Sequence, residues 1–159
     1  MSSDSSVMKS LVCFLLVAFG ALALSWAESG ALSAKIQVVE DVGDFLSANP
    51  EAVLAKLTPL RTPRAILYTL GSRVPKDRLV ANARDSTSWA TPQNVQLVLN
   101  YPTNGVGANV SYVSVLVNQT SNLGAAYVLS GGIGQRQVSL LVEAKNTYTF
   151  GYLAEIYGF

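Results

Sequence analysis

The residue types on which most enzymes and zinc sites depend are almost absent from this chain. It contains no histidine, and its single cysteine, Cys13, lies in an apolar segment near the start. Without histidine, the Ser-His-Asp and Cys-His arrangements that activate a nucleophile cannot form. Zinc sites built from histidine and cysteine are excluded for the same reason. The composition therefore predicts a protein that is not an enzyme and that has no catalytic residues, metal site or cofactor.

Carboxylates are the remaining side chains that can support catalysis. The second half of the chain holds Asp77, Asp85, Glu143 and Glu155, spread widely along the sequence. Glu143 and Glu155 can in principle act as the acid and base of a glycoside hydrolase. Charged residues are, however, mostly exposed and without such a role. We therefore expect both glutamates to face solvent, and a carboxylate-dependent hydrolase is the most distant alternative.

The run Gly131-Gly132-Ile133-Gly134 superficially resembles a phosphate-binding loop. A predicted strand follows it where a phosphate loop requires a helix, and no Lys-Ser or Lys-Thr pair closes it. Turns between strands often need positive φ angles, which glycine adopts without steric cost. The run is therefore expected to form a turn. Trp89 is expected to anchor the core at the end of a strand, with surface recognition as the alternative.

The charge distribution argues against direct binding of nucleic acid. The chain has 11 basic and 10 acidic residues and a net charge of +1, whereas phosphate binding depends on clustered lysine and arginine. The basic residues between Arg61 and Arg84 are interrupted by Asp77 and Asp85, which indicates a solvated face. We expect an unidentified protein or small-molecule partner, and the oligomeric state stays open.

Residues 1–27 have the pattern of a secretory signal peptide. Lys9 precedes an apolar run from Leu11 to Leu24, which is shorter than the ~20 residues that span a bilayer. Small residues follow, and they suit cleavage after Ser25 or Ala27. The mature chain is thus predicted to be secreted and extracellular, without a membrane anchor. In such a protein the sequences Asn109-Val110-Ser111 and Asn118-Gln119-Thr120 predict glycosylation of Asn109 and Asn118.

Residues 28–62 are predicted to form a helical extension and a linker. Ile36, Val39, Val42 and Leu46 recur at the spacing of an amphipathic helix. Asn49-Pro50 is typical of the start of a second helix. The proline-containing segment 58–63 indicates a linker. We expect this extension to be separable, so that deletion of residues 28–60 leaves a folded domain.

Residues 63–159 are predicted to form a mainly β domain, an antiparallel sandwich or barrel of about seven strands. The predicted strands are rich in valine, leucine and tyrosine and are separated by turn residues. They cover residues 65–70, 78–83, 95–101, 110–117, 125–129, 137–142 and 148–157. Alternation places Val138, Leu140 and Val142 on one core face, and Phe150, Tyr152, Ala154 and Ile156 on another. The run 110–117 is apolar on both sides, which predicts a strand covered twice.

Short pieces spread from residue 71 to residue 158 carry a family resemblance. They are Gly71-Ser72-Arg73 with Pro75, Asp77-Arg78-Leu79-Val80, Ser88-Trp89, Asn118-Gln119-Thr120 followed by Gly124-Ala125, Ser130-Gly131-Gly132-Ile133-Gly134, and Glu155-Ile156-Tyr157-Gly158. In this order and spacing they resemble the insect family named after multiprotein bridging factor type two, whose relatives are often labelled probable salivary secreted peptides. The motif residues are Gly71, Arg73, Pro75, Asp77, Arg78, Trp89, Gly131, Gly132, Gly134, Glu155, Tyr157 and Gly158. This chain departs from the family at Ile133, where proline is expected.

The resemblance implies a small, β-rich, secreted domain without catalytic residues. It also implies a link to transcription, because the founding member is described as a co-activator that bridges other factors. Combined with the predicted signal peptide, it favours a secreted, non-enzymatic binding protein, extracellular or salivary. A transcriptional co-activator is the alternative.

Overall fold

The computed structural model describes residues 31–63 and 65–159, so the predicted signal peptide, 1–27, lies outside the described part. The fold is mainly β, as predicted, and consists of one open antiparallel sheet of eight strands. The strands are β1 (Ser33–Val39), β2 (Ala55–Lys56), β3 (Pro59–Arg61), β4 (Ile66–Gly71), β5 (Arg78–Tyr101), β6 (Val110–Gln119), β7 (Gly124–Gly131) and β8 (Val138–Gly158). A short helix, α1 (Gly43–Ala48), and a 3-10 turn (Pro50–Ala52) lie between β1 and β2. The narrower prediction of a sandwich or barrel is not confirmed, since the strands form one continuous sheet.

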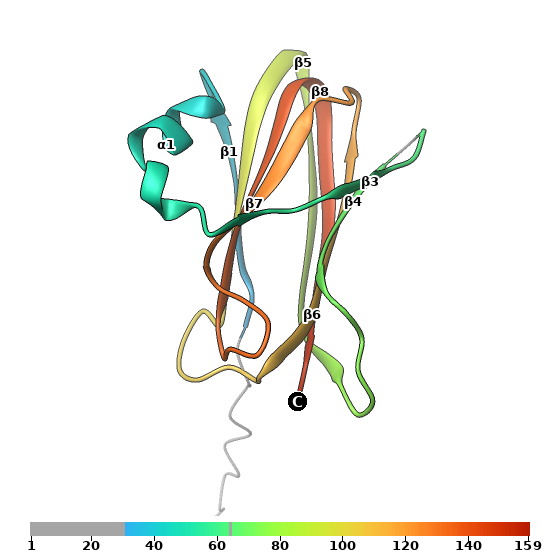
Figure 1. Ribbon diagram of the computed structural model, residues 1–159. Helices are drawn as coiled ribbons and strands as arrows, with labels where there is room; N and C mark the ends of the chain where they lie inside the picture. The colour runs from blue at the N-terminus through green and yellow to red at the C-terminus, as the bar shows by residue number, and fades with distance from the viewer. Residues whose placement is uncertain (1–30, 64) are drawn as a thin grey trace, which may run out of the picture.

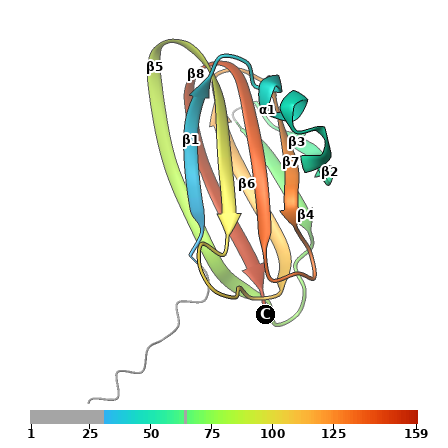
Figure 2. The same cartoon turned by 90° about the vertical axis from the view of Figure 1, so that its left-hand side faces the viewer.

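Two long strands, β5 and β8, form the axis of this sheet. They pair as an antiparallel ribbon from Arg78 opposite Gly158 to Tyr101 opposite Val138. The ribbon arches over at one end of the molecule (Figures 1 and 2), and its register is irregular between Ser88 and Val95. On one side of the arch β1 joins β5 and β7 joins β8, while on the other side β6 joins β8.

The arch explains why fewer strands are found beyond residue 63 than the sequence predicts. The predicted strands 78–83 and 95–101 are parts of β5, and 137–142 and 148–157 are parts of β8. The turn residues that separated them, Thr91-Pro92 and Asn146-Thr147, lie at the arch, and Asn146 has a φ of 52°. Polar and turn-forming residues thus mark a bend in a continuous ribbon.

The alternating apolar residues on both sides of the arch build a single core. Phe150, Tyr152, Ala154 and Ile156 are buried together with Val138, Leu140 and Val142, as the period-two pattern predicts. The prediction that residues 110–117 are covered on both faces is wrong, because Tyr112, Ser114 and Leu116 are only partly buried. The doubly buried segment is instead in β8, where Leu141 and Glu143 on the outer face are buried as fully as their inward-facing neighbours.

The predicted helix across residues 36–46 is wrong. Residues Ser33–Val39 form β1, which pairs with β5 from Asn100 to Asn94, and α1 contains only 6 residues, none of them buried. Helices this short gain little stability on their own, whereas the edge of β5 offers a row of backbone partners. The β-branched residues Ile36, Val38 and Val39 also favour an extended strand.

The predicted linker is likewise part of the sheet. Pro59–Arg61 forms β3, which pairs with β4, and Leu57 is 4 % exposed and belongs to the core. The segment before it covers the outer face of β5 and β8, since Val42 is buried and accepts a hydrogen bond of 3.0 Å from Gln96 Nε2. The extension predicted to be separable is therefore integrated into the fold.

Glu143 lies under this segment, which corrects the expectation that it faces solvent. Glu143 is only 4 % exposed, and its Oε1 lies 3.4 Å from Gln96 Nε2. Burial raises the pKa of Glu143, and the nearby Asp41 adds to this effect, while Gln96, Lys145 and Lys56 oppose it. Ionised Glu143 is thus costly to the folded state.

Deletion of residues 28–60 is expected to abolish cooperative unfolding or to lower its midpoint strongly. The deletion removes β1 and Leu57, and each large apolar side chain that it exposes costs about 1.5–3 kcal/mol, against a total stability of about 5–15 kcal/mol. Circular dichroism of chains that begin at residues 28 and 61 measures the difference. Unchanged, cooperative unfolding of the shorter chain would show that the extension is separable after all.

The substitution Glu143→Gln is expected to stabilise the protein at neutral pH, by about 1 kcal/mol. Because the pKa of Glu143 is raised on folding, the wild-type chain loses stability as pH rises through that pKa, and the neutral amide does not. The advantage should shrink as the pH falls to 4, where the carboxyl is largely protonated, and vanish at about pH 3, where it is protonated in both states. Urea unfolding at pH 4 and pH 8 measures it, with Glu155→Gln on the same strand as the control. A variant advantage that is equal at both pH values contradicts this account.

Candidate protein-interaction surface

Most of the predicted motif residues lie at one end of the sheet, opposite the arch. Here β4 ends at Gly71, β5 begins at Arg78, and Gly158 of β8 lies opposite Arg78. The glycine turn between β7 and β8 reaches the same end, since the Gly134 N–H donates to the Val110 carbonyl at 2.8 Å. Trp89 is the exception, because it packs against the core in the part of β5 next to the arch.

The turn between β4 and β5 has a defined local geometry. The Asp77 N–H donates to the Val74 carbonyl at 3.2 Å. Pro75 therefore occupies the second position of the turn, and Lys76, with a φ of 73°, occupies the third. Proline followed by a residue with positive φ is the pattern of a type II turn. The turn directs the side chains on both sides of it, Arg73 and Asp77, toward one another.

The carboxylate of Asp77 fixes this turn to the sheet. It accepts hydrogen bonds from Arg73 Nη2 at 2.7 Å and Arg73 Nε at 2.9 Å. It also accepts from the Val74 N–H at 3.0 Å and from Ser111 Oγ of β6 at 2.9 Å. The Asp77 side chain is only 2 % exposed. Hydrogen bonding to the Arg73 guanidinium, together with the donors from Val74 and Ser111, holds the pKa of Asp77 well below its usual range.

Arg73 also connects the turn to the aromatic residues at the end of β8. Its guanidinium carbon lies 3.6 Å from the centre of the Tyr157 ring, a cation–π arrangement. The Tyr157 ring lies 6.0 Å from that of Tyr112 on β6, and the Tyr157 hydroxyl donates to Glu155 at 3.4 Å. Because the Arg73 side chain is 50 % exposed, this stacked group remains open to a partner.

Glycines at this end permit close approach of the backbones. Gly71 has a φ of 75°, and a Cβ there would lie 2.4 Å from the Ser111 carbonyl oxygen. A Cβ on Gly158 would lie 2.5 Å from the Asn109 carbonyl oxygen. Ile133, which departs from the family pattern, packs its side chain against Gly71. The glycines and Ile133 thus bring the ends of β4, β6 and β8 together.

Exposed apolar side chains surround the stacked Arg73 and Tyr157. Val74 is 37 % exposed, Leu79 and Ile133 are each 43 % exposed, and Phe159 is 61 % exposed. We call the group Arg73, Val74, Leu79, Ile133, Tyr157 and Phe159 the motif-end surface. Aromatic and arginine side chains are the types enriched where proteins bind one another. In the sequence Ser111 stands out only as the third residue of Asn109-Val110-Ser111, and no local pattern indicates its hydrogen bond to Asp77.

The two predicted glycosylation residues differ in their surroundings. Asn118 is exposed in β6, whereas Asn109 is partly buried and its Oδ1 is enclosed without a hydrogen-bond partner. Ser111, which completes the first acceptor sequence, is 4 % exposed. Modification of either residue stays a prediction.

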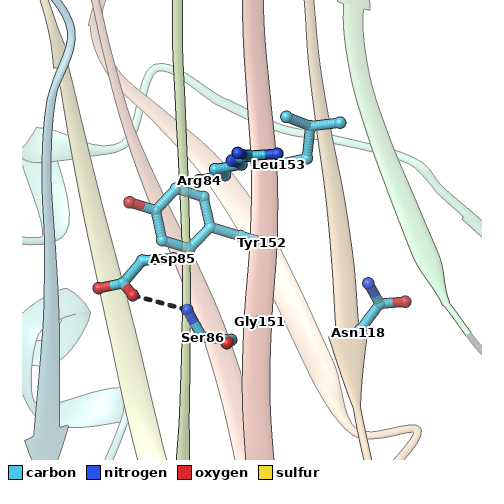
Figure 3. Close-up of a pocket in the computed structure, with 7 residues that line it drawn as sticks. All are labelled: Arg84, Asp85, Ser86, Asn118, Gly151, Tyr152 and Leu153. Atoms are coloured by element: carbon cyan, nitrogen blue, oxygen red, sulfur yellow. Dashed lines mark hydrogen bonds between the residues drawn. The ribbon is translucent and has the colours of Figure 1, made fainter.

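A hollow of about 400 Å³ opens on β5, β6 and β8 (Figure 3). It exists because Gly151 of β8, which has no side chain, lies between Ser86 of β5 and Asn118 of β6 in the register. Its lining residues are Arg84, Asp85, Ser86, Asn118, Gly151, Tyr152 and Leu153. Nothing in their arrangement resembles a catalytic acid–base pair.

Across 31–63 and 65–159, no group of three histidine, cysteine, aspartate or glutamate side chains is placed to hold a metal ion. In the same part of the chain, no helix has the length and apolar character needed to cross a membrane.

Comparison with known protein families matches residues 70–158 to the family described as "Transcription activator MBF2". The matched region begins at the end of β4 and includes every predicted motif residue, so the predicted family resemblance is confirmed. No curated protein matches the chain, and no solved structure does.

The close approach at Gly71 yields a test with an internal control. Gly71→Ala and Gly105→Ala both place a side chain at a positive φ, of 75° and 70° respectively, at a cost of about 1–2 kcal/mol each. Only Gly71→Ala also forces a Cβ against the β6 backbone, since nothing lies within 4 Å of a Cβ at Gly105. We expect Gly71→Ala to lower the free energy of unfolding clearly more than Gly105→Ala in urea titrations. Equal losses would show that β4 and β6 do not approach so closely.

Proposed function

We propose that this chain, which belongs to the MBF2 transcription activator family, is a transcriptional co-activator that binds other proteins and catalyses no reaction. The observation that carries the proposal is the family match over residues 70–158. The motif-end surface supports it, because that surface combines exposed apolar side chains with a stacked arginine and tyrosine. The balanced charge of the chain, +1 overall, favours contact with proteins over contact with DNA phosphates.

The family match contradicts the predicted secreted, extracellular location. The family is described by its action on transcription, which points to a nuclear or other intracellular role. The apolar run Leu11–Leu24, on which the prediction rested, is outside the described residues. N-linked glycans belong to the secretory pathway, so the predicted glycosylation of Asn109 and Asn118 loses its premise. The insect and salivary labels of the resemblance remain untested.

The motif-end surface is the part of the molecule best suited to bridging. Its side chains come from the turn after β4, the start of β5, the glycine turn and the end of β8. The Asp77 hydrogen bonds fix the geometry of the Arg73 side chain before any partner arrives, which reduces the entropy that binding must overcome. Leu79 lies opposite Tyr157 in the β5–β8 register, so an apolar partner side chain can contact both.

A transcription assay tests the proposal. The full chain, fused to an unrelated DNA-binding domain, is expected to raise expression of a reporter gene in cultured cells. Leu79→Asp is expected to reduce this activation at least tenfold, because a charge in the centre of an apolar contact costs about 2 kcal/mol or more. Val38→Asp is the matched control, since Val38 is an exposed strand residue of β1, 50 % exposed, and lies outside the motif-end surface.

The thermal unfolding of both variants is measured alongside the reporter, so that loss of activity is separated from loss of folding. If the wild-type fusion does not activate the reporter, the co-activator proposal is contradicted. Equal activation by the wild type and a folded Leu79→Asp variant would remove the motif-end surface from the mechanism.

A further inference from the structure

One edge of the sheet is left without a neighbouring strand. Residues 94–100 of β5 pair with β1 on one side and β8 on the other, but residues 78–88 pair only with β8. Among the described residues no strand lies on the second side of this segment, which forms the left margin of Figure 2. We call residues 78–88 of β5 the free edge. A strand edge of this length presents a row of backbone donors and acceptors that suits a further strand.

The free edge already has one of its donors occupied by a local acceptor. Oδ1 of Asp85 accepts a hydrogen bond of 2.7 Å from the Ser86 N–H (Figure 3). This N–H therefore points away from β8. Because backbone groups alternate in direction along a strand, the N–H and C=O groups of Asn82, Arg84 and Ser88 point the same way. At Ser86 the Asp85 carboxylate therefore takes the place that the carbonyl of a neighbouring strand would occupy.

The hollow beside the free edge can receive a long side chain from an added strand. In the register, Ser86, Gly151 and Asn118 form one row across β5, β8 and β6. Because Ser86 and Gly151 are small, this row forms the part of the hollow that we call the channel, with Asn118 at its far end. A side chain opposite Ser86 on an added strand would lie over this channel, since cross-strand neighbours share a face.

The charge beside the channel selects an acidic side chain. Arg84 and Asp85 both line the hollow. Because side chains alternate along a strand, the exposed Arg84 and not Asp85 shares the face of Ser86. Within 31–63 and 65–159 the ion pair formed is that of Arg73 with Asp77, so Arg84 has no acidic partner there. A glutamate entering the channel would pair with the Arg84 guanidinium and accept a hydrogen bond from Ser86 or Asn118.

We propose that the free edge of β5 binds an extended, acidic segment of a partner protein as an additional strand, with a glutamate opposite Ser86 reaching into the hollow beside Arg84. This proposal rests on the proposed function, because it specifies how a protein partner is held. The free edge includes Leu79, so an added strand would continue directly from the motif-end surface. Asp85 competes with the added strand for the Ser86 N–H, so binding must displace this one contact.

Binding is measured with a defined probe and the full chain. The probe is an acetylated and amidated seven-residue peptide of alternating threonine and valine with glutamate at its centre, and the matched peptide has lysine there. We expect the glutamate peptide to shift the amide NMR signals of residues 82–88 and to slow hydrogen exchange at Ser86. The lysine peptide is expected to bind at least tenfold more weakly, because it meets Arg84.

Three substitutions at exposed positions refine the test. Arg84→Gln should remove most of the preference for glutamate over lysine, while Arg136→Gln, an exposed arginine in the β7–β8 turn, should leave it unchanged. Asp85→Ala should strengthen binding of the glutamate peptide severalfold, because it frees the Ser86 N–H and removes a like charge. A glutamate peptide with N-methyl groups on alternate residues facing β5 should not bind.

Signal shifts outside the free edge, equal binding of the two peptides, or weaker binding to Asp85→Ala would overturn the proposal. So would self-association of the chain through residues 82–88 in place of peptide binding. The peptide experiment has no transcriptional readout, so its failure leaves the reporter result intact. A negative reporter assay with positive peptide binding would instead reject the co-activator function and keep the strand-binding edge.

Discussion

The pairing of β5 with β8 on both sides of the arch sets the position of every other strand. Because the two strands pair on both sides of the arch, each of them contributes one segment to either side of the core. The inward-facing residues from both sides meet in one apolar cluster, with Leu97 and Leu140 on one side of the arch and Phe150 and Ile156 on the other. The other strands then add to the free sides of this ribbon, which fixes where each can lie.

The other strands pair unequally along the two sides of the β5–β8 ribbon, and this leaves surfaces that a partner can contact. β1 covers the edge of β5 over residues 94–100 only, and the segment with Val42 covers the outer face near Glu143. Among the described residues, none covers the opposite part of β5 or the ends of β4 and β8 in this way. The motif-end surface, the free edge and the hollow all lie in this uncovered part. All three are exposed because no further strand or segment among the described residues packs there.

Burial and hydrogen bonding keep the chain rigid around this uncovered part. Asp77 is held by Arg73, Val74 and Ser111, and its depressed pKa means that these contacts persist across the physiological pH range. Glu143 has the opposite character, since burial raises its pKa and makes its ionised form costly. Ionised Asp77 therefore stabilises the motif-end surface, whereas ionised Glu143 destabilises the fold where the segment with Val42 covers it.

The mainly β class, the core faces of β8 and the family could all be predicted from the sequence, because alternation and short motifs are local properties of the chain. Phe150, Tyr152 and Ile156 could be assigned to the core from their period of two alone. The sequence could not decide that residues 33–39 form a strand, since Ile36, Val39 and Val42 also suit a helix and only the edge of β5 selects the extended form. It also could not reveal that Thr91-Pro92 marks an arch within one strand, or that Glu143 is buried. Likewise, only the tertiary structure brings Asp77 to Ser111 and leaves Arg84 beside an open edge, because these relationships join residues whose contact depends on how the whole ribbon bends.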